Sequence, residues 1–253
     1  MIRQRLGKDL LFFDGGMGTL LQEKGLAPGE LPETWNLTHS EEIYKIHRQY
    51  IEAGSDIILT NTFGANALKF HDDSCSLEEI IKAAVSHVKK AEREALLQTG
   101  DERKIYTALD VGPTGKLLKP MGDLEFETAY EAFKEVVILG EQAGADLIHI
   151  ETMSDTYELK AAVLAAKENT SLPVFATVIF DERKKLLTGA DVSSVVALLE
   201  GLGVDALGIN CAMGPKEMLP VLEELIKYSS VPIIVKPNAG LPKQRDGKTY
   251  YGV

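Results

Sequence analysis

One pattern recurs three times along the chain and restricts what it can fold into. The segments EAGSDIILTNTFG, QAGADLIHIETMS and GLGVDALGINCAMG each contain a helix end, a glycine, a variable residue, an aspartate and an apolar run. Gly54, Gly144 and Gly203 stand where a residue of left-handed conformation often closes a helix. We interpret these segments as helix-to-strand connections. Helices and strands that alternate in this way predict an α/β fold with a parallel sheet.

Apolar runs bounded by such signals predict seven strands, at 10–16, 57–64, 105–113, 147–153, 173–180, 206–211 and 232–240. In a chain of 253 residues this number favours a (β/α)8 TIM barrel truncated before strand eight, with the segment GLPKQRDGKTYYGV as a loop. A doubly wound open sheet is the main alternative. Nothing divides residues 1–253, so one domain is expected. The barrel is favoured because polar residues end most strands: Asp14, Asn61, Asp110, Glu151, Asn210, Cys211 and Asn238.

Composition excludes several classes of partner. The net charge of −11 disfavours nucleic acids and anionic membranes, which bind basic surfaces. No apolar run approaches the ~18 residues of a membrane span, and the N-terminus lacks the features of a signal peptide. Two cysteines make no disulfide framework. We therefore predict a cytoplasmic protein with neither nucleic-acid nor membrane partners.

The stretch LLFFDGGMGTLL, residues 10–21, carries Asp14 into a glycine-rich turn. Its glycine spacing does not match a dinucleotide fingerprint. Such a turn can present backbone N–H groups to a carboxylate, while Asp14 and Glu151 hold an ammonium group, which together describe a site for an amino acid. The alternative interpretation is structural: Asp14 caps the following turn and the glycines only permit it.

Cys211 ends the sixth predicted strand in GINCAMGP. It is interpreted as a buried hydrophobe, a catalytic nucleophile or a ligand of a soft metal, and the residues alone leave these three possibilities open. Cys75 lies in a polar stretch that is poorly placed for a shared metal site. His149, on a predicted strand, is more typical of a core histidine. The remaining histidines have no metal-ligand spacing: His39, His47, His71 and His87.

Seven motifs in order resemble the homocysteine S-methyltransferase family, and most closely the N-terminal homocysteine-binding domain of cobalamin-dependent methionine synthases. The resemblance runs from about residue 10 to the end of the chain. Its motifs are FFDGGMGTLLQEKG, IEAGSDIILTNTFGAN, DVGPTGKLL, IETMSDTYELKAAVLAAK, LTGADV, GINCAMGP and KPNAGLP. This family has a (β/α) barrel whose strand ends hold a zinc ion.

The resemblance implies a role for several residues. Cys211 becomes a zinc ligand, and Asn238 occupies the metal's open position when substrate is absent. The other two zinc ligands of the family are adjacent cysteines after strand eight, so the chain by itself is not expected to bind zinc tightly. Asp14 and Glu151 receive the substrate ammonium. The remaining implied residues are Gly15, Gly16 and Thr62, whose N–H groups bind the carboxylate, and Asn61 and Asn210, which line the pocket.

The implied function is methyl transfer to homocysteine to give methionine, with the thiol activated on zinc and methylcobalamin as donor on another domain or subunit. Cobalamin-binding and methyl-donor domains are therefore the expected partners. Two alternatives remain: a non-catalytic or fragmentary amino-acid-binding barrel, and an unrelated barrel lyase. The lyase would use Glu151 as a base or Lys236 as a Schiff-base lysine.

Overall fold

The structure is a computed structural model, and it describes residues 1–70, 74–100, 102–240, 242–245 and 248–251, the last two stretches by their backbone. The strands are β1 (Ile57–Leu59), β2 (Tyr106–Val111), β3 (Leu147–Met153), β4 (Val174–Val178), β5 (Ala206–Asn210), β6 (Ile233–Lys236), β7 (Pro242–Arg245) and β8 (Lys248–Tyr251). The helices are α1 (Met17–Glu23), α2 (Trp35–Thr38), α3 (Ser40–Glu52), α4 (Leu77–Thr99), α5 (Phe126–Ala143), α6 (Thr156–Asn169), α7 (Val192–Gly201) and α8 (Pro215–Tyr228), with 3-10 turns η1 (Ile2–Gln4) and η2 (Pro32–Thr34).

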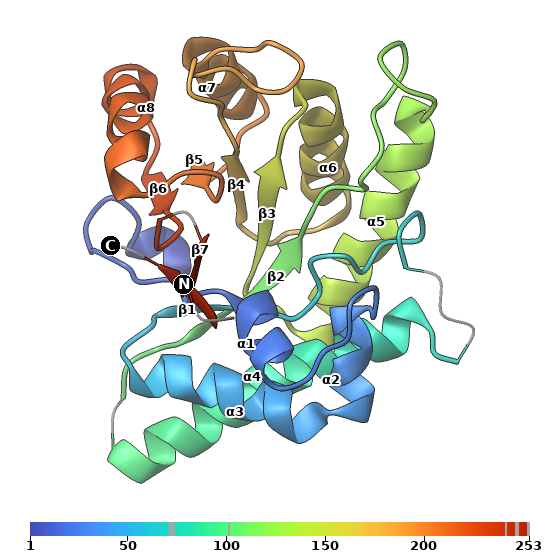
Figure 1. Ribbon diagram of the computed structural model, residues 1–253, viewed down its shortest axis with the longest axis vertical. Coiled ribbons are helices and arrows are strands. Elements are labelled where there is room, and N and C mark those ends of the chain that lie inside the picture. The colour runs from blue at the N-terminus through green and yellow to red at the C-terminus, as the bar shows by residue number, and fades with distance from the viewer. Residues whose placement is uncertain (71–73, 101, 241, 246–247, 252–253) are drawn as a thin grey trace.

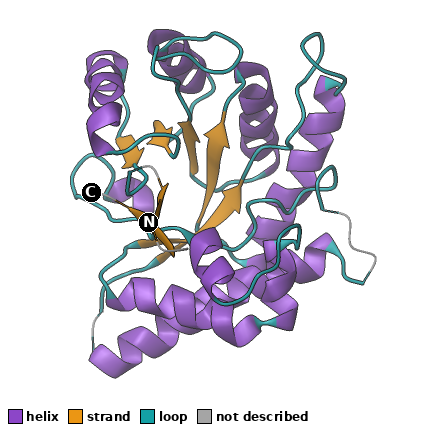
Figure 2. Cartoon of the chain, in the orientation of Figure 1, coloured by secondary structure: helices purple, strands orange, loops and turns teal. Residues whose placement is uncertain are grey.

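Strands β1 to β6 form one parallel sheet in their sequence order. The sheet curls, so that the strand direction turns from β1 to β4, and the helices lie along its outer side (Figures 1 and 2). Consecutive parallel strands joined by helices are the architecture of a TIM barrel. The predicted α/β class and barrel-type sheet are confirmed, and the doubly wound alternative is not, because neighbours in this sheet never skip a strand.

The first predicted strand, 10–16, is much shorter than expected. Its pairing with β1 is a single parallel bridge between Phe13 and Ile57, with a backbone bond of 2.9 Å from Asp14 N to Ile57 O. The chain stays extended to Gly16, and α1 begins at Met17. Within the described residues the segment has no ladder partner on its other side, so it does not reach the length of a regular strand.

The C-terminal segment also differs from its prediction. Part of the expected loop forms an antiparallel hairpin, in which β7 pairs with β8 from Pro242 opposite Tyr251 to Arg245 opposite Lys248. The hairpin is a sheet of its own. Thr249, Tyr250 and Tyr251 are of residue types enriched in strands, but the segment is too short and too polar around them to give a clear strand pattern.

The recurring glycine and aspartate have the roles that their pattern predicts. Gly54, Gly144 and Gly203 have φ values of +110°, +95° and +73°, which reverse the chain after each helix. Each following aspartate accepts a hydrogen bond from the backbone of the preceding strand segment. These bonds run from Phe12 N to Asp56, from Thr107 N to Asp146 and from Val174 N to Asp205, at 2.8 to 3.0 Å. The motif thus fixes the start of each strand against its neighbour.

Two layers of apolar side chains form the core. The larger cluster lies between the sheet and the helices and contains Leu109, Ile148 and Val178 among its buried members. A second cluster fills the interior of the curled sheet, where Tyr106, Ala108 and Ile2 pack together. Because side chains alternate along a strand, the residues of this interior face continue toward the carboxyl ends of the strands. Those ends carry the polar residues discussed below.

Side chains cap α4 and α6 at their N-termini. Ser76 and Glu79 form a reciprocal capping box at the start of α4. Asp155 caps α6, but Glu158 does not complete a box, because its carboxylate accepts from Thr114 N and Oγ1 instead. Pro220 lies inside α8. Among the described residues, no helix combines the length and the apolar character that a membrane span needs.

His47 gives a prediction about stability. The ring is fully buried on α3, and neither nitrogen has a hydrogen-bond partner. Burial, with the nearby charge of His87, lowers its pKa from 6.5 to about 3. Below pH 6.5 the unfolded chain binds a proton at this position and the folded chain does not, so stability is lost as the pH falls. We expect this loss to reach about 2 kcal/mol at pH 5 and to be absent in His47→Leu.

Urea unfolding of the two proteins at pH 8 and pH 5 measures the difference. The exposed His39→Gln variant is the control, and it is expected to retain the pH dependence of the unchanged protein. The same loss of stability in His47→Leu as in the unchanged protein would contradict the assignment.

Candidate functional site

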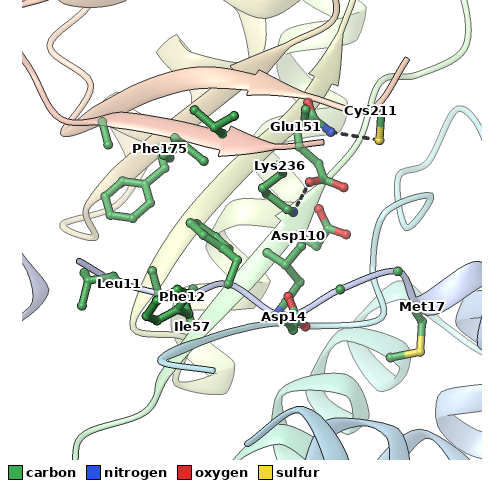
Figure 3. A pocket seen from close by; sticks show the side chains of 18 of the residues that line it. Leu11, Phe12, Asp14, Met17, Ile57, Asp110, Glu151, Phe175, Cys211 and Lys236 are labelled. Atoms are coloured by element: carbon green, nitrogen blue, oxygen red, sulfur yellow. Dashed lines mark hydrogen bonds and ion pairs between the residues drawn. The ribbon is translucent and has the colours of Figure 1, made fainter. Parts of the chain in front are cut away.

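A cavity of about 740 Å³ runs along the interior of the curled sheet, from the amino ends of β5 and β6 at Ala206 and Ile233 to the carboxyl ends of the strands. Its wall includes the turn after Phe13, the ends of β2, β3, β5 and β6, and the loop after β1 (Figure 3). Eight of the nine residues predicted to form the site line this cavity: Asp14, Gly15, Gly16, Asn61, Glu151, Asn210, Cys211 and Asn238. The structure therefore brings together segments that lie more than 200 residues apart in sequence.

Thr62 is the exception. Its amide donates to the Thr60 carbonyl at 2.9 Å and its hydroxyl donates to the Asp110 carbonyl at 2.8 Å. The side chain is buried and does not line the cavity. Thr62 thus fixes the end of β2 through a hydrogen bond outside the cavity. Its role in binding a substrate carboxylate stays a prediction.

Asp14 lies at the end of the short first segment, where its backbone is fixed against Ile57. One carboxylate oxygen, Oδ2, accepts from Leu59 N at 2.9 Å, and the other, Oδ1, is buried without a hydrogen-bond partner. Burial raises the pKa of Asp14 to about 7, helped by repulsion from Glu151 and opposed by the charge of Lys236 and the bond from Leu59. The carboxyl group is thus poised between its charged and neutral forms near neutral pH.

Asp110 projects from β2 on the interior face, which it shares with Tyr106 and Ala108. It is 6% exposed, and its Oδ1 has no hydrogen-bond partner. Burial first, and then repulsion from Glu151, raise its pKa well above the usual range of an aspartate. Sequence reasoning noted Asp110 as a strand-end residue but gave it no role.

Glu151 and Lys236 form an ion pair across the cavity, with Lys236 Nζ 2.7 Å from Glu151 Oε2. The Lys236 ammonium also lies 5.1 Å from the centre of the Phe13 ring. Burial lowers the pKa of Lys236, but attraction to Glu151, Asp14 and Asp110 outweighs it, and the pKa is raised. Burial alone would raise the pKa of Glu151, whereas the hydrogen bond from His149 and the charge of Lys236 lower it overall.

His149 is a core histidine, as the sequence analysis favoured. The ring is fully buried, and its Nε2 lies 3.4 Å from Glu151 Oε2 and 3.5 Å from Thr177 Oγ1. Burial lowers its pKa, so it is neutral at physiological pH. His149 contacts Glu151 through Nε2 and does not itself line the cavity.

Cys211 lies in a turn that Asn210 holds in place. Asn210 accepts from Thr152 N at 3.0 Å and donates to Thr152 Oγ1 at 2.7 Å. Its amide also lies 3.4 Å from Cys211 Sγ. Thr152, Cys211 and Ala212 all have positive φ, of 64°, 54° and 58°, a conformation uncommon for residues with a side chain. The sequence gives no sign of this turn, which directs the Cys211 thiol to the cavity (Figure 3).

Asn61 and Asn238 fix the rim of the cavity. Asn61 Nδ2 donates to Pro32 O at 2.8 Å, which holds the segment before α2 over the loop after β1. The backbone N–H of Asn238 donates to Met213 O at 3.1 Å, and this bond joins the segment after β6 to the Cys211 turn. Glu33, which sequence reasoning missed, also lines the cavity, and it accepts from Gly64 N at 2.6 Å. Its loop position offered no pattern that could have revealed it.

The chain's donor set does not by itself fit a thiolate zinc site. Within the residues that the structure describes, no group of three His, Cys, Asp or Glu side chains is arranged to hold a metal ion. Cys211 lines the cavity, whereas Cys75 packs against the outer core. Structural and catalytic zinc sites need at least three protein ligands.

Comparisons with known proteins place the chain in a family of enzymes. The family model for homocysteine S-methyltransferase matches residues 11–252. Methionine synthases from Mycobacterium leprae (strain TN) and Mycobacterium tuberculosis (strain ATCC 25618 / H37Rv) are each 34% identical over 94% of this chain. The chain spans about a fifth of the length of these two relatives, 21% in each case.

Solved structures agree on the fold. The metallated form of the homocysteine methyltransferase MmuM from Escherichia coli superposes with a TM-score of 0.83 at 24% identity, over 92% of this chain and 85% of that one. The apo form of the same protein gives a TM-score of 0.76 over 90% of this chain and 82% of that one. The fold is thus a (β/α) barrel of the kind found in MmuM. More particularly, the chain belongs to the homocysteine S-methyltransferase family.

The glycine turn gives a second prediction. A Cβ atom added at Gly15 would lie 2.7 Å from the Tyr50 hydroxyl and 3.0 Å from a ring carbon, whereas one added at Gly18 would meet no atom within 4 Å. We expect Gly15→Ala to destabilise the protein by about 1–3 kcal/mol through overpacking. The control Gly18→Ala, inside α1, is expected to be neutral or to stabilise by up to about 1 kcal/mol. Equal shifts of the two urea midpoints would contradict this account.

Proposed function

We propose that this domain binds homocysteine and presents its thiol for methyl transfer, giving methionine. The observation that carries the proposal is the arrangement of one cavity: an acidic cluster from β2, β3 and the first segment lies on one side, and the Cys211 thiol lies at the rim beyond it (Figure 3). An amino acid with a sulfur at the end of its side chain matches this order of charges and sulfur. The family supports the reaction type.

The chain's residues would divide the work of binding. The acidic cluster would attract the substrate ammonium, and Gly15 and Gly16, which line the cavity, would offer their backbone N–H groups to the carboxylate. The ring of Tyr50 packs under Gly15, and its hydroxyl donates to Gly16 O at 3.2 Å, which keeps the turn in one conformation. A rigid turn loses little freedom when the substrate binds.

Cys211 is better suited to ligation than to nucleophilic attack. A cysteine nucleophile needs a neighbouring base. The hydrogen bond found at its sulfur comes from Asn210, which donates, and the nearest core histidine is engaged with Glu151 and Thr177. A soft metal such as zinc accepts a thiolate ligand of this kind.

Zinc and methylcobalamin complete the proposal from the family resemblance. Cys211 would supply one zinc ligand and Asn238 would lie beside the open position, and the other ligands would have to come from outside the described residues. A bound zinc ion lowers the pKa of a coordinating thiol. Methylcobalamin would reach the cavity mouth from another domain or subunit. The mycobacterial relatives are about five times longer than this chain, which leaves room for such domains in those proteins.

The lyase alternative finds less support. A Schiff-base lysine is activated by a lowered pKa. Lys236 instead has a raised pKa because three carboxylates surround it, and its ammonium is paired with Glu151. A lysine held in its charged form cannot attack a carbonyl group.

Calorimetric titration of L-homocysteine with and without added zinc tests the proposal. In a protein that also supplies the remaining zinc ligands, we expect zinc to strengthen the binding of homocysteine at least several-fold and to leave the binding of L-2-aminobutyrate, which lacks the thiol, unchanged. Cys211→Ser should abolish the zinc-dependent increase in homocysteine affinity, because zinc would lose the Cys211 thiolate as a ligand. Cys75→Ser is the matched control and should retain it, since Cys75 does not line the cavity.

Two results would contradict the proposal. One is an affinity for homocysteine no higher than for L-2-aminobutyrate at any zinc concentration. The other is an equal loss of the zinc effect in both cysteine variants, because it would show that the metal binds elsewhere.

A further inference from the structure

The charges that line the cavity do not balance. Among its lining residues within the described part of the chain, Lys236 is the only lysine or arginine, whereas three carboxylates surround it on the interior face. These are Asp14, Asp110 and Glu151. The Lys236 ammonium is bonded to Glu151 alone of the three, at 2.7 Å. Two buried carboxyl groups are therefore left facing the cavity without a cation of their own.

The unfilled acceptor atoms can be named. Asp14 Oδ1 and Asp110 Oδ1 are both buried and both lack a hydrogen-bond partner. Glu151 Oε2, in contrast, is in contact with Lys236 and lies 3.4 Å from His149. A buried polar atom without a partner costs stability, and native proteins rarely keep one without a reason. Two such atoms on one cavity wall indicate a bound group that donates hydrogen bonds.

The fold does not require the Asp110 carboxylate. The hydrogen bonds that reach this residue from the loop after β1 use its backbone: its N–H donates to Thr60 Oγ1 at 3.1 Å and its carbonyl accepts from Thr62 at 2.8 Å. The next residues inward on the same face of β2 are apolar. An apolar residue at 110 would therefore serve packing at least as well, so the carboxylate is explained by a ligand rather than by the sheet.

We propose that Asp110 is a substrate-binding residue, and that the substrate ammonium binds between Asp14 and Asp110 while Lys236 keeps Glu151 occupied. Lys236 is in this arrangement a positioning residue, because it acts through Glu151 and removes that carboxylate from ammonium binding. The amino-acid identity of the ligand rests on the proposed function. The position of the ammonium rests on the unfilled oxygens and the ion pair.

The electrostatics of the cluster agree with this position. The groups that face Asp110 are Asp14, Glu33 and Glu151, which repel its charge, and Lys236, which attracts it. One further cation would relieve the repulsion between Asp14 and Asp110. A ligand without an ammonium group would leave both oxygens unfilled, so the cavity should discriminate strongly between a substrate and its des-amino analogue.

Three ligands separate the groups of the substrate. L-homocysteine carries both charged groups, 4-mercaptobutyrate lacks the ammonium, and 3-mercaptopropylamine lacks the carboxylate. We expect Asp110→Asn to weaken the binding of homocysteine and of 3-mercaptopropylamine at least tenfold, and to change that of 4-mercaptobutyrate less than twofold. Binding is measured by calorimetry on the full chain.

Removal of Lys236 provides a second test. In Lys236→Met, Glu151 is released and can accept the ammonium in place of Asp110. We therefore expect the tenfold penalty of Asp110→Asn to fall to about threefold or less in the Lys236→Met background. An unchanged penalty would overturn the role given to Lys236.

The thermal midpoint of the ligand-free protein distinguishes binding from structure. Asp110→Asn should not lower the midpoint, because the amide occupies the same space and cannot be repelled as a charge by Asp14, Glu33 and Glu151. The control Glu158→Gln should lower it and leave all three affinities unchanged, since Glu158 is buried away from the cavity and accepts twice from Thr114. A lowered midpoint in Asp110→Asn, with equal weakening of all three ligands, would show that Asp110 is structural and would overturn the proposal.

Failure of the proposed function would look different. In that case the unchanged protein would bind 3-mercaptopropylamine in an Asp110-dependent manner but would not prefer homocysteine. Binding of neither amine by the unchanged protein would overturn both proposals.

Discussion

The curl of the sheet is the constraint on which the site depends. Glu151 lies near the carboxyl end of β3 and Lys236 lies at the carboxyl end of β6. Two other strands separate β3 from β6 in the sheet. Three strand spacings in a flat sheet amount to about 14 Å. The two side chains nevertheless meet at 2.7 Å. A strongly curled sheet brings these two strand ends opposite one another, so the ion pair depends on the same curvature that forms the cavity.

The interior of the barrel changes character along its axis, and the alternation of side chains explains why. On β2 the inward residues run from Tyr106 through Ala108 to Asp110, and on β3 from Leu147 through His149 to Glu151. Each strand thus begins in hydrocarbon and ends in a carboxylate. The apolar side chains lower the local dielectric beside the carboxylates, which strengthens the electrostatic interactions among the charged residues. The same two strands therefore supply apolar side chains that stabilise the fold and buried carboxylates that can bind a ligand.

Much of this arrangement could be predicted from sequence because the signals are local. The glycine after each helix and the aspartate before each strand predict the connections, and the carboxyl ends of parallel strands must meet at one edge of the sheet. What local patterns could not supply are contacts between distant segments. The bond between Lys236 and Glu151 spans 85 positions. The hydrogen bond from Thr152 N to Asn210 Oδ1 joins residues 58 positions apart. It lies beside three residues that have positive φ although none of them is glycine. Thr62 is a further example, because it follows β1 closely and was therefore expected to line the cavity. Its hydroxyl instead donates to the carbonyl of Asp110, a contact between distant segments that the sequence does not indicate.

Backbone strain and two unpaired carboxylate oxygens occur together at this end of the barrel. The left-handed residues Thr152, Cys211 and Ala212 lie beside the cavity, and so do the unpartnered oxygens of Asp14 and Asp110. Each feature costs folding free energy of order 1–3 kcal/mol, which the apolar core beneath must offset. At the opposite end of the barrel, the carboxylates of Asp56, Asp146 and Asp205 are all bonded to the neighbouring segment. One molecule thus satisfies its acidic groups where they fix the strands and leaves them unsatisfied where a ligand can bind, and this contrast separates the aspartates of the fold from those of the site.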